Sequence, residues 1–257
     1  MELPRAMAAA LVRAVELRMP AVRALWFLVA LSLALLVSAR ADSTNRQGDL
    51  KEMPAYINSR SVANDAIRHA GSQAELGDLY YSDQGVKQDL KEAVWVYTQA
   101  ADQGHVEAQN NLGDMYQHGE GVKQDLKEAV RLYGLAADQG YVEAQFNLGG
   151  MYQHGQGVKQ DSKEAVRLYS LAADQGHAGA QDNFGHMLYL GKGVKQNLKE
   201  AARLYGLATD QGHAAAQNNL GYLYYSGKGV KQDLKEAVWV YTQAADQGSA
   251  EAQNNGI

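Results

Sequence analysis

Four histidines at one repeated position are the side chains of this sequence best suited to bind a metal ion. They are His69, His105, His177 and His213, separated by 36 residues or by twice that number. Stacked helical layers lie about 10 Å apart, whereas a metal holds its nitrogen ligands about 2 Å away. A ladder with this spacing cannot chelate a metal within one chain. We therefore predict neither a metal site nor a cofactor.

Motifs for other kinds of catalysis are missing from the sequence. It contains no H-E-x-x-H motif, no G-x-S-x-G motif and no Walker A loop. The absence of cysteine excludes thiol nucleophiles, thiolate metal sites and disulfides. The formal net charge of −5 argues against a nucleic-acid partner, which would require a basic surface. We predict that the protein is not an enzyme.

Four variable positions in a repeated sequence predict a binding surface. In the second repeat they are Asn110, Asp114, Gln117 and His118, whose spacing places them on one helical face. Stacked repeats would align these faces along a concave groove, where aromatic side chains could bind a peptide. The alternative is drift at exposed positions after recent duplication. The predicted protein-binding groove comprises Asp78, Tyr81, Asn110, Asp114, Gln117, His118, Phe146, Gln153, His154, Asp182, His186, Tyr189, Asn218, Tyr222 and Tyr225.

A repeat of 36 residues must position these side chains. The string Gly-Val-Lys-Gln begins at Gly85, Gly121, Gly157, Gly193 and Gly229. A period of this length is typical of solenoids and arrays. Five repeats occupy residues 69–248, and residues 249–257 begin a truncated sixth. The five repeats span residues 69–104, 105–140, 141–176, 177–212 and 213–248.

Each repeat is predicted to form two antiparallel helices. In the second repeat, helix A runs over about residues 106–118 and ends at Gly119 and Gly121. Helix B begins with Asp125 as N-cap, and Glu128 three residues later suggests a capping box. It ends before Gly140. The predicted buried residues, spaced for one helical face, are Ala108, Leu112, Met115 and Tyr116 in helix A and Ala129, Tyr133, Ala136 and Ala137 in helix B.

The repeated pattern resembles the Sel-1-like repeat, a relative of the tetratricopeptide repeat. The residues that carry it in the second repeat are Ala108, Leu112, Gly113, Tyr116, Gly119, Gly121, Val122, Asp125, Ala129, Tyr133, Ala136, Ala137 and Gly140. Asp83, Asn197 and Leu188 depart from it in other repeats. The resemblance implies an all-α fold, a right-handed α/α superhelical solenoid of antiparallel helix pairs.

The resemblance also implies an adaptor function, with a protein or peptide as the partner. Family members hold ubiquitin ligase complexes together in endoplasmic-reticulum-associated degradation, which is one alternative role for this chain. Others serve bacterial extracytoplasmic signalling and host interaction. Some bacterial relatives are linked to β-lactam binding, but those are rich in cysteine, and this chain has none.

Residues 1–41 are predicted to be a signal peptide. Residues 24–39 form an uncharged apolar run, preceded by four arginines and followed by the small-x-small pattern Ala39-Arg40-Ala41. The alternatives are an uncleaved signal anchor, which would be the only membrane contact, and a true start at Met19. Either form predicts a location in the secretory pathway or outside the cytoplasm: the endoplasmic reticulum lumen, the periplasm or the exterior. Residues 42–68 are interpreted as a linker with a degenerate N-terminal cap.

The two ends of the array show further differences. Trp95 and Trp239 stand where the three middle repeats have arginine, a difference that we attribute to copying of one repeat from the other. An apolar end left open by the incomplete sixth repeat could support self-association.

Overall fold

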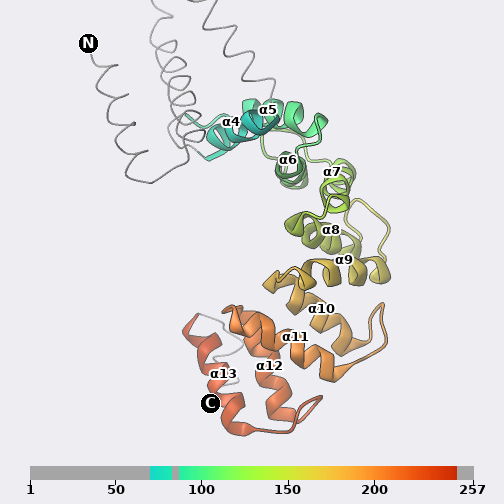
Figure 1. Ribbon diagram of the computed structural model, residues 1–257, viewed down its shortest axis with the longest axis vertical. Coiled ribbons are helices and arrows are strands. Elements are labelled where there is room, and N and C mark those ends of the chain that lie inside the picture. Colours follow the sequence, from blue (N-terminus) through green and yellow to red (C-terminus); the bar gives the residue numbers. More distant parts are fainter. Residues whose placement is uncertain (1–69, 83–86, 248–257) are drawn as a thin grey trace, which may run out of the picture. The chain divides into compact units, whose positions relative to one another are not determined.

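The computed structural model describes residues 70–82 and 87–247, and its helices alternate as helix A and helix B of each repeat (Figure 1). The predictions for residues 1–41, 42–68 and 249–257 fall outside the described residues. All ten helices of the described part have 13 residues. They are α4 (Ala70–Ser82), α5 (Leu90–Asp102), α6 (Val106–His118), α7 (Leu126–Asp138), α8 (Val142–His154), α9 (Ser162–Asp174), α10 (Ala178–Leu190), α11 (Leu198–Asp210), α12 (Ala214–Ser226) and α13 (Leu234–Asp246).

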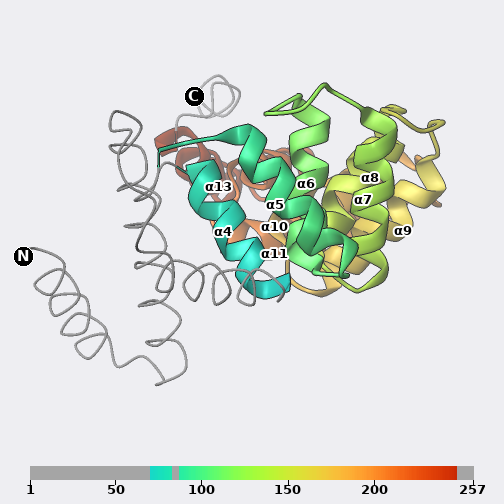
Figure 2. The ribbon, with the colours of Figure 1, turned by 90° about the horizontal axis from the view of Figure 1, so that it is seen from above.

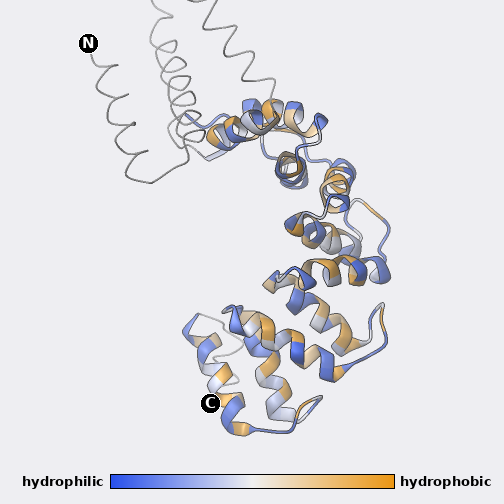
Figure 3. Cartoon of the chain, in the orientation of Figure 1, coloured by the Kyte–Doolittle hydropathy of each residue, from blue (hydrophilic) through white to orange (hydrophobic). Residues whose placement is uncertain are grey.

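The chain divides into two compact units, residues 1–108 and 109–257. The described part of the first unit contains α4, α5 and the first residues of α6. In the second unit, α7, α8 and α9 lie side by side (Figure 2), and each helix from α7 onward packs on the next one as far as α13. Each helix alternates apolar and polar residues around its axis, as Figure 3 shows. The predicted all-α solenoid of antiparallel helix pairs is therefore confirmed.

Every helix B begins with an Asp or Asn N-cap. The Asp125 carboxylate accepts hydrogen bonds from the backbone N–H groups of Lys127 and Glu128 at 3.0 and 3.1 Å, which satisfies two of the unpaired donors of the first turn. Asn197 accepts one such bond, from Glu200 N–H. The A helices α8, α10 and α12 each end on a glycine in the left-handed conformation, and Gly155 at the end of α8 has φ +69°. The predicted helix boundaries of the second repeat are confirmed.

The predicted capping box is only half formed. The Asp125 side chain caps α7, but the Glu128 carboxylate pairs with Arg131 at 2.6 Å instead of returning to the N-cap backbone. The Asp125 N–H donates instead to the Tyr116 carbonyl, at the end of helix A. That bond ties the start of helix B to the preceding helix of the same repeat.

Small residues set the spacing of the two helices in a repeat. Tyr133 is buried in α7, and a Cβ atom at Gly113 of α6 would lie 2.9 Å from its ring. Only glycine allows the two helices to approach so closely. The predicted buried residues of the second repeat are buried, apart from Tyr116, which is half-buried.

Glutamine pairs tie helix A to helix B of the same repeat. Gln175 Nε2 donates to Gln145 Oε1 at 2.8 Å, and Gln145 Nε2 donates to the Ala137 carbonyl of the preceding repeat at 3.4 Å. The same pair recurs as Gln139 with Gln109 and as Gln211 with Gln181. The buried amides of Gln145 and Gln181 therefore join helix A to helix B of their own repeat and to the preceding repeat.

Candidate functional site

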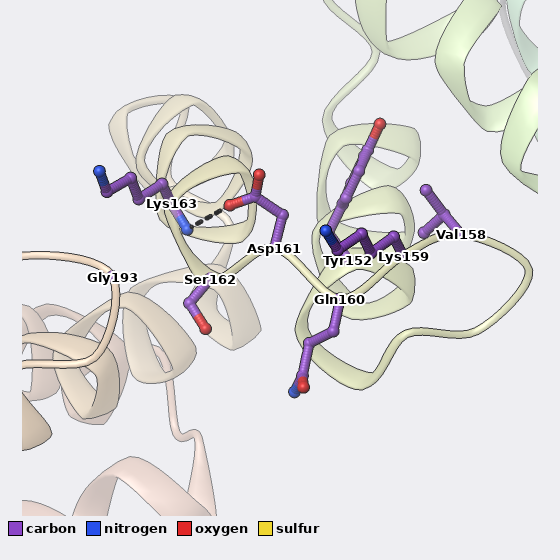
Figure 4. A pocket seen from close by; sticks show the side chains of 8 residues that line it. All are labelled: Tyr152, Val158, Lys159, Gln160, Asp161, Ser162, Lys163 and Gly193. Atoms are coloured by element: carbon purple, nitrogen blue, oxygen red, sulfur yellow. Dashed lines mark hydrogen bonds between the residues drawn. The ribbon is translucent and has the colours of Figure 1, made fainter.

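A shallow pocket of about 570 Å³ lies between two neighbouring loops of the second unit (Figure 4). It is lined by Tyr152, Val158, Lys159, Gln160, Asp161, Ser162, Lys163 and Gly193. The Asp161 carboxylate already accepts the Lys163 N–H at the start of α9, drawn as a dashed line in the figure. Most of this lining recurs in every repeat as Gly-Val-Lys-Gln followed by Asp or Asn, so the pocket is a property of the repeat and not a site of its own.

Three of the four recurring histidines lie in the described residues, and all three cap helices. His177 Nδ1 accepts the Ala180 N–H at 3.0 Å, and His213 accepts the Ala216 N–H at 3.3 Å, at the starts of α10 and α12. His105 accepts the Ala108 N–H in the same way. Burial lowers the pKa of His177, which favours the neutral ring that can accept a bond. This N-cap role is not among the predictions from the sequence, although the position directly before helix A is where such a role would be expected.

The first of the four variable positions lies between repeats. Asn110 and Asp182 are buried, and they accept hydrogen bonds from Asn147 and Asn219 of the following repeats at 3.3 and 2.9 Å. Phe146 is half-buried and stacks on His177, with ring centroids 4.5 Å apart. Asn218 is half-buried at the same position. These side chains contribute to contacts within the stack.

The other three positions form an exposed or half-exposed surface in the second unit, which we call the variable face. Its members are Asp114, Gln117, His118, Gly150, Gln153, His154, His186, Tyr189, Leu190, Tyr222, Tyr225 and Ser226. In the first unit, the corresponding Asp78 and Tyr81 are exposed, and Asp78 accepts the Tyr97 hydroxyl at 2.6 Å.

Buried tyrosines of helix B reach the variable face with their hydroxyl groups. The Tyr133 hydroxyl lies 3.2 Å from an Asp114 carboxylate oxygen and 2.9 Å from Gln117 Oε1. The Tyr169 hydroxyl donates to Gln153 Oε1 at 2.7 Å. Burial raises the pKa of Tyr169 to about 12 and raises that of Tyr133 further, since the Asp114 charge adds to the effect. These phenols therefore stay neutral and act as donors from beneath the face.

The fourth and fifth repeats carry a different cluster on this face, formed by two tyrosines and a lysine. Lys228 Nζ donates to the hydroxyls of Tyr222 at 2.9 Å and Tyr189 at 3.3 Å. The tyrosine rings meet edge to face, with centroids 6.3 Å apart, and Nζ lies 5.0 Å from the Tyr222 centroid. The hydrogen bonds raise the pKa of Lys228, and the bond from Lys228 lowers that of Tyr222.

The cluster extends over exposed apolar surface. The Tyr225 side chain is 59% exposed and lies one helical turn from Tyr222, and Leu190 next to Tyr189 is 53% exposed. The predicted groove contains the three tyrosines but not Lys228. The sequence does distinguish this position, because its residue changes from an amide or acid to lysine along the array. The five repeats carry Gln84, Glu120, Gln156, Lys192 and Lys228 there.

Comparison with known proteins identifies the family of the chain. A family model described as the Sel1 repeat matches residues 70–105, 106–141, 142–177, 178–213 and 214–249. The chain belongs to the Sel1 repeat family. Each matched Sel1 repeat begins one residue after the boundary taken from the sequence. A comparison with curated proteins finds no match.

Two solved structures are similar over most of the chain. A Sel1 repeat protein from Oxalobacter formigenes is 38% identical, with a TM-score of 0.68, and the match covers 73% of this chain and 77% of that one. A protective antigen of uropathogenic Escherichia coli strains, which displays the Sel1-like fold, is 33% identical, with a TM-score of 0.70. That match covers 87% of this chain but only 47% of the antigen. Neither name states a catalytic activity.

In the part of the chain that the structure describes, no helix has both the length and the apolar character needed to span a bilayer. The apolar run at residues 24–39 lies outside that part.

Proposed function

We propose that the chain is a non-enzymatic adaptor that binds a protein segment along the variable face of its Sel1 repeats. The observation that supports this most is an aromatic group on one face of α10 and α12, formed by the exposed Tyr222 and Tyr225 and the half-buried Tyr189. Tyrosine side chains bury a large area on binding and lose little conformational entropy. Sel1 repeat proteins generally mediate protein interactions, which agrees with this assignment.

The adaptor is proposed to act outside the cytoplasm or within the secretory pathway. The support is the charge and hydropathy pattern of residues 1–41, in which basic residues precede a short apolar run. Its partner is a protein or a peptide, and the proposal includes no nucleic acid and no cofactor. Protease protection of the full chain would test the compartment. Digestion in intact cells, or only after internal membranes are lysed, agrees with the proposal. Digestion as soon as the plasma membrane alone is opened would place the chain in the cytoplasm and contradict it.

Site-directed photocrosslinking in the native host tests the binding face. A photoreactive phenylalanine replaces Tyr225 on the variable face, and in a matched control it replaces Leu171, which is exposed on helix B of the third repeat. We expect discrete protein adducts from position 225 and none of these from position 171. Identical adducts from both positions, or none from position 225, would contradict the adaptor function at this face.

A further inference from the structure

The fourth and fifth repeats differ from the second and third repeats in charge at the same places. On the variable face and its adjoining loop, the second repeat carries Asp114, Gln117 and Glu120, whereas the fifth carries Tyr222, Tyr225 and Lys228. The fourth repeat resembles the fifth, because it carries His186, Tyr189 and Lys192 at these positions. One end of the second unit therefore presents aromatic and basic groups where the other presents acids and amides.

The cluster around Lys228 exists at a single junction of the second unit. It needs a tyrosine at the Gln117 position of one repeat and another at the Asp114 position of the next. At the earlier junctions of this unit the corresponding pairs are Gln117 with Gly150 and Gln153 with His186. Only Tyr189 and Tyr222 complete the pair, and their two hydroxyls hold the ammonium group between them.

The hydrogen-bond donors of this cluster are arranged for an anion. An ammonium group has three N–H donors, and two of those of Lys228 are used by the tyrosine oxygens. Each tyrosine oxygen accepts from Lys228, and the two hydroxyls also interact with each other, which leaves at least one O–H to donate elsewhere. The third N–H of Lys228 is likewise available. Within the described residues, no carboxylate forms an ion pair with Lys228 or Lys192.

We infer that this cluster, formed by Tyr189, Tyr222 and Lys228, binds an Asp or Glu side chain of an acidic partner segment. The inference rests on the adaptor function proposed above and specifies its ligand. A carboxylate has two acceptor oxygens for the donors of the cluster, and charged hydrogen bonds of this kind are the stronger ones. A protein segment is favoured over a free anion because the exposed apolar surface of Tyr225 and Leu190 would accept its neighbouring side chains.

Selection from random peptides tests the inference with the full chain. Dodecapeptides displayed on phage are selected on the immobilised full-length protein in mild detergent. We expect the retained pool to be enriched in Asp or Glu next to an apolar residue. A synthetic peptide from that pool should lose about tenfold in affinity when its acidic residue becomes the amide.

Substitutions in the protein locate the contact. Lys228→Gln introduces the residue that the third repeat carries at this position, so the fold should be retained and the circular dichroism spectrum unchanged. We expect about a tenfold loss of peptide affinity for Lys228→Gln and a smaller loss for Tyr222→Phe, which removes one hydroxyl. The matched control is Lys231→Gln, which removes the same charge at an exposed lysine that recurs in every repeat. The affinity of this variant for the peptide should stay within about twofold of the native value.

The outcomes separate this inference from the adaptor function. A retained pool without acidic enrichment, or an acidic peptide that binds Lys228→Gln as well as the native chain, overturns the carboxylate contact and leaves peptide binding intact. Displacement of the peptide by millimolar inorganic phosphate overturns the assignment to a protein side chain in favour of a free anion. If no peptide is retained above background, both the adaptor function and this inference fail.

Discussion

Asp182 places a carboxylate at a buried position where the second and fifth repeats have Asn110 and Asn218. Its oxygen accepts a hydrogen bond from Asn219 at 2.9 Å, but burial still raises the pKa of the carboxyl group. The unfolded chain releases this proton near pH 3.9, whereas the folded chain retains it to a higher pH. Stability therefore falls as the pH rises through that interval, and the loss persists at neutral pH.

Asp182→Asn should stabilise the protein at neutral pH. The amide keeps an oxygen acceptor for Asn219 and removes the buried charge, as Asn110 does opposite Asn147. We expect Tm at pH 7 to rise by roughly 2–4 °C, the shift that about 1 kcal/mol produces in a chain of this size. The difference should shrink as the pH approaches 4. Thermal scans across this range would contradict the argument if the variant were less stable at pH 7, since attraction between Asp182 and His213 or His186 would then outweigh burial.

The pairing of helices depends on which glycines face a neighbouring ring. A Cβ atom at Gly149 in α8 would lie 2.8 Å from the buried Tyr169 ring of α9, whereas one at Gly134 in α7 would meet no atom within 4 Å. The two glycines lie inside helices, where alanine is intrinsically favoured. Whether a glycine-to-alanine substitution raises or lowers stability is therefore decided by packing at Gly149 and by helix propensity at Gly134.

Gly149→Ala and Gly134→Ala should shift stability in opposite directions. Gly149→Ala forces the Tyr169 ring and the two helices apart, which typically costs about 1–3 kcal/mol. Gly134→Ala should stabilise by about 0.5–1 kcal/mol because it restricts the unfolded chain and favours the helix. Urea unfolding of both variants beside the native chain provides the measurement. A gain in stability for Gly149→Ala would show that the helices do not pack as described.

The repeat period and the capping residues make the helices predictable from the sequence. The roles of individual positions are not predictable in this way, because they depend on contacts with the neighbouring repeat. Asp125 and Gly140 mark the ends of α7 in the sequence, and α7 spans the expected residues. The sequence could not show that Asn110 bonds to Asn147, because that contact joins residues 37 apart in different repeats. Nor could it place Lys228 between Tyr189 and Tyr222, since the loop and two helices meet only after stacking. The aromatic stripe was predicted, and its binding role stays a prediction.

At the scale of the molecule, stability should be distributed over repeats that interact with their neighbours. In the second unit, the side-chain hydrogen bonds between repeats join residues 8, 37 or 39 apart, as in Gln145 with Ala137, Asn219 with Asp182 and Lys228 with Tyr189. Such arrays behave approximately as sums of repeat terms and nearest-neighbour interfaces. The buried core of this unit runs along the array, and one continuous cluster extends from Ala165 to Val240.

Removal of one complete repeat should leave the rest folded. Deletion of residues 142–177 joins Tyr141 to Ala178 and restores the same kind of helix junction. We expect unchanged helicity per residue and a Tm lower by several degrees, because one repeat and one interface are lost. Circular dichroism during heating gives both values. Deletion of residues 142–159 is the control: it removes one helix of a pair and should abolish the cooperative transition, and equal behaviour of both variants would contradict the repeat model.

The bonds between neighbouring repeats also have a mechanical consequence. A chain pulled from its two ends would load these interfaces in series, so tension would break them one after another instead of all at once. Each repeat of 36 residues would release about 120 Å of extended chain. A repeat protein of this design would lengthen in steps under load while its remaining repeats stay folded, and would shorten again as each repeat docks on its neighbour.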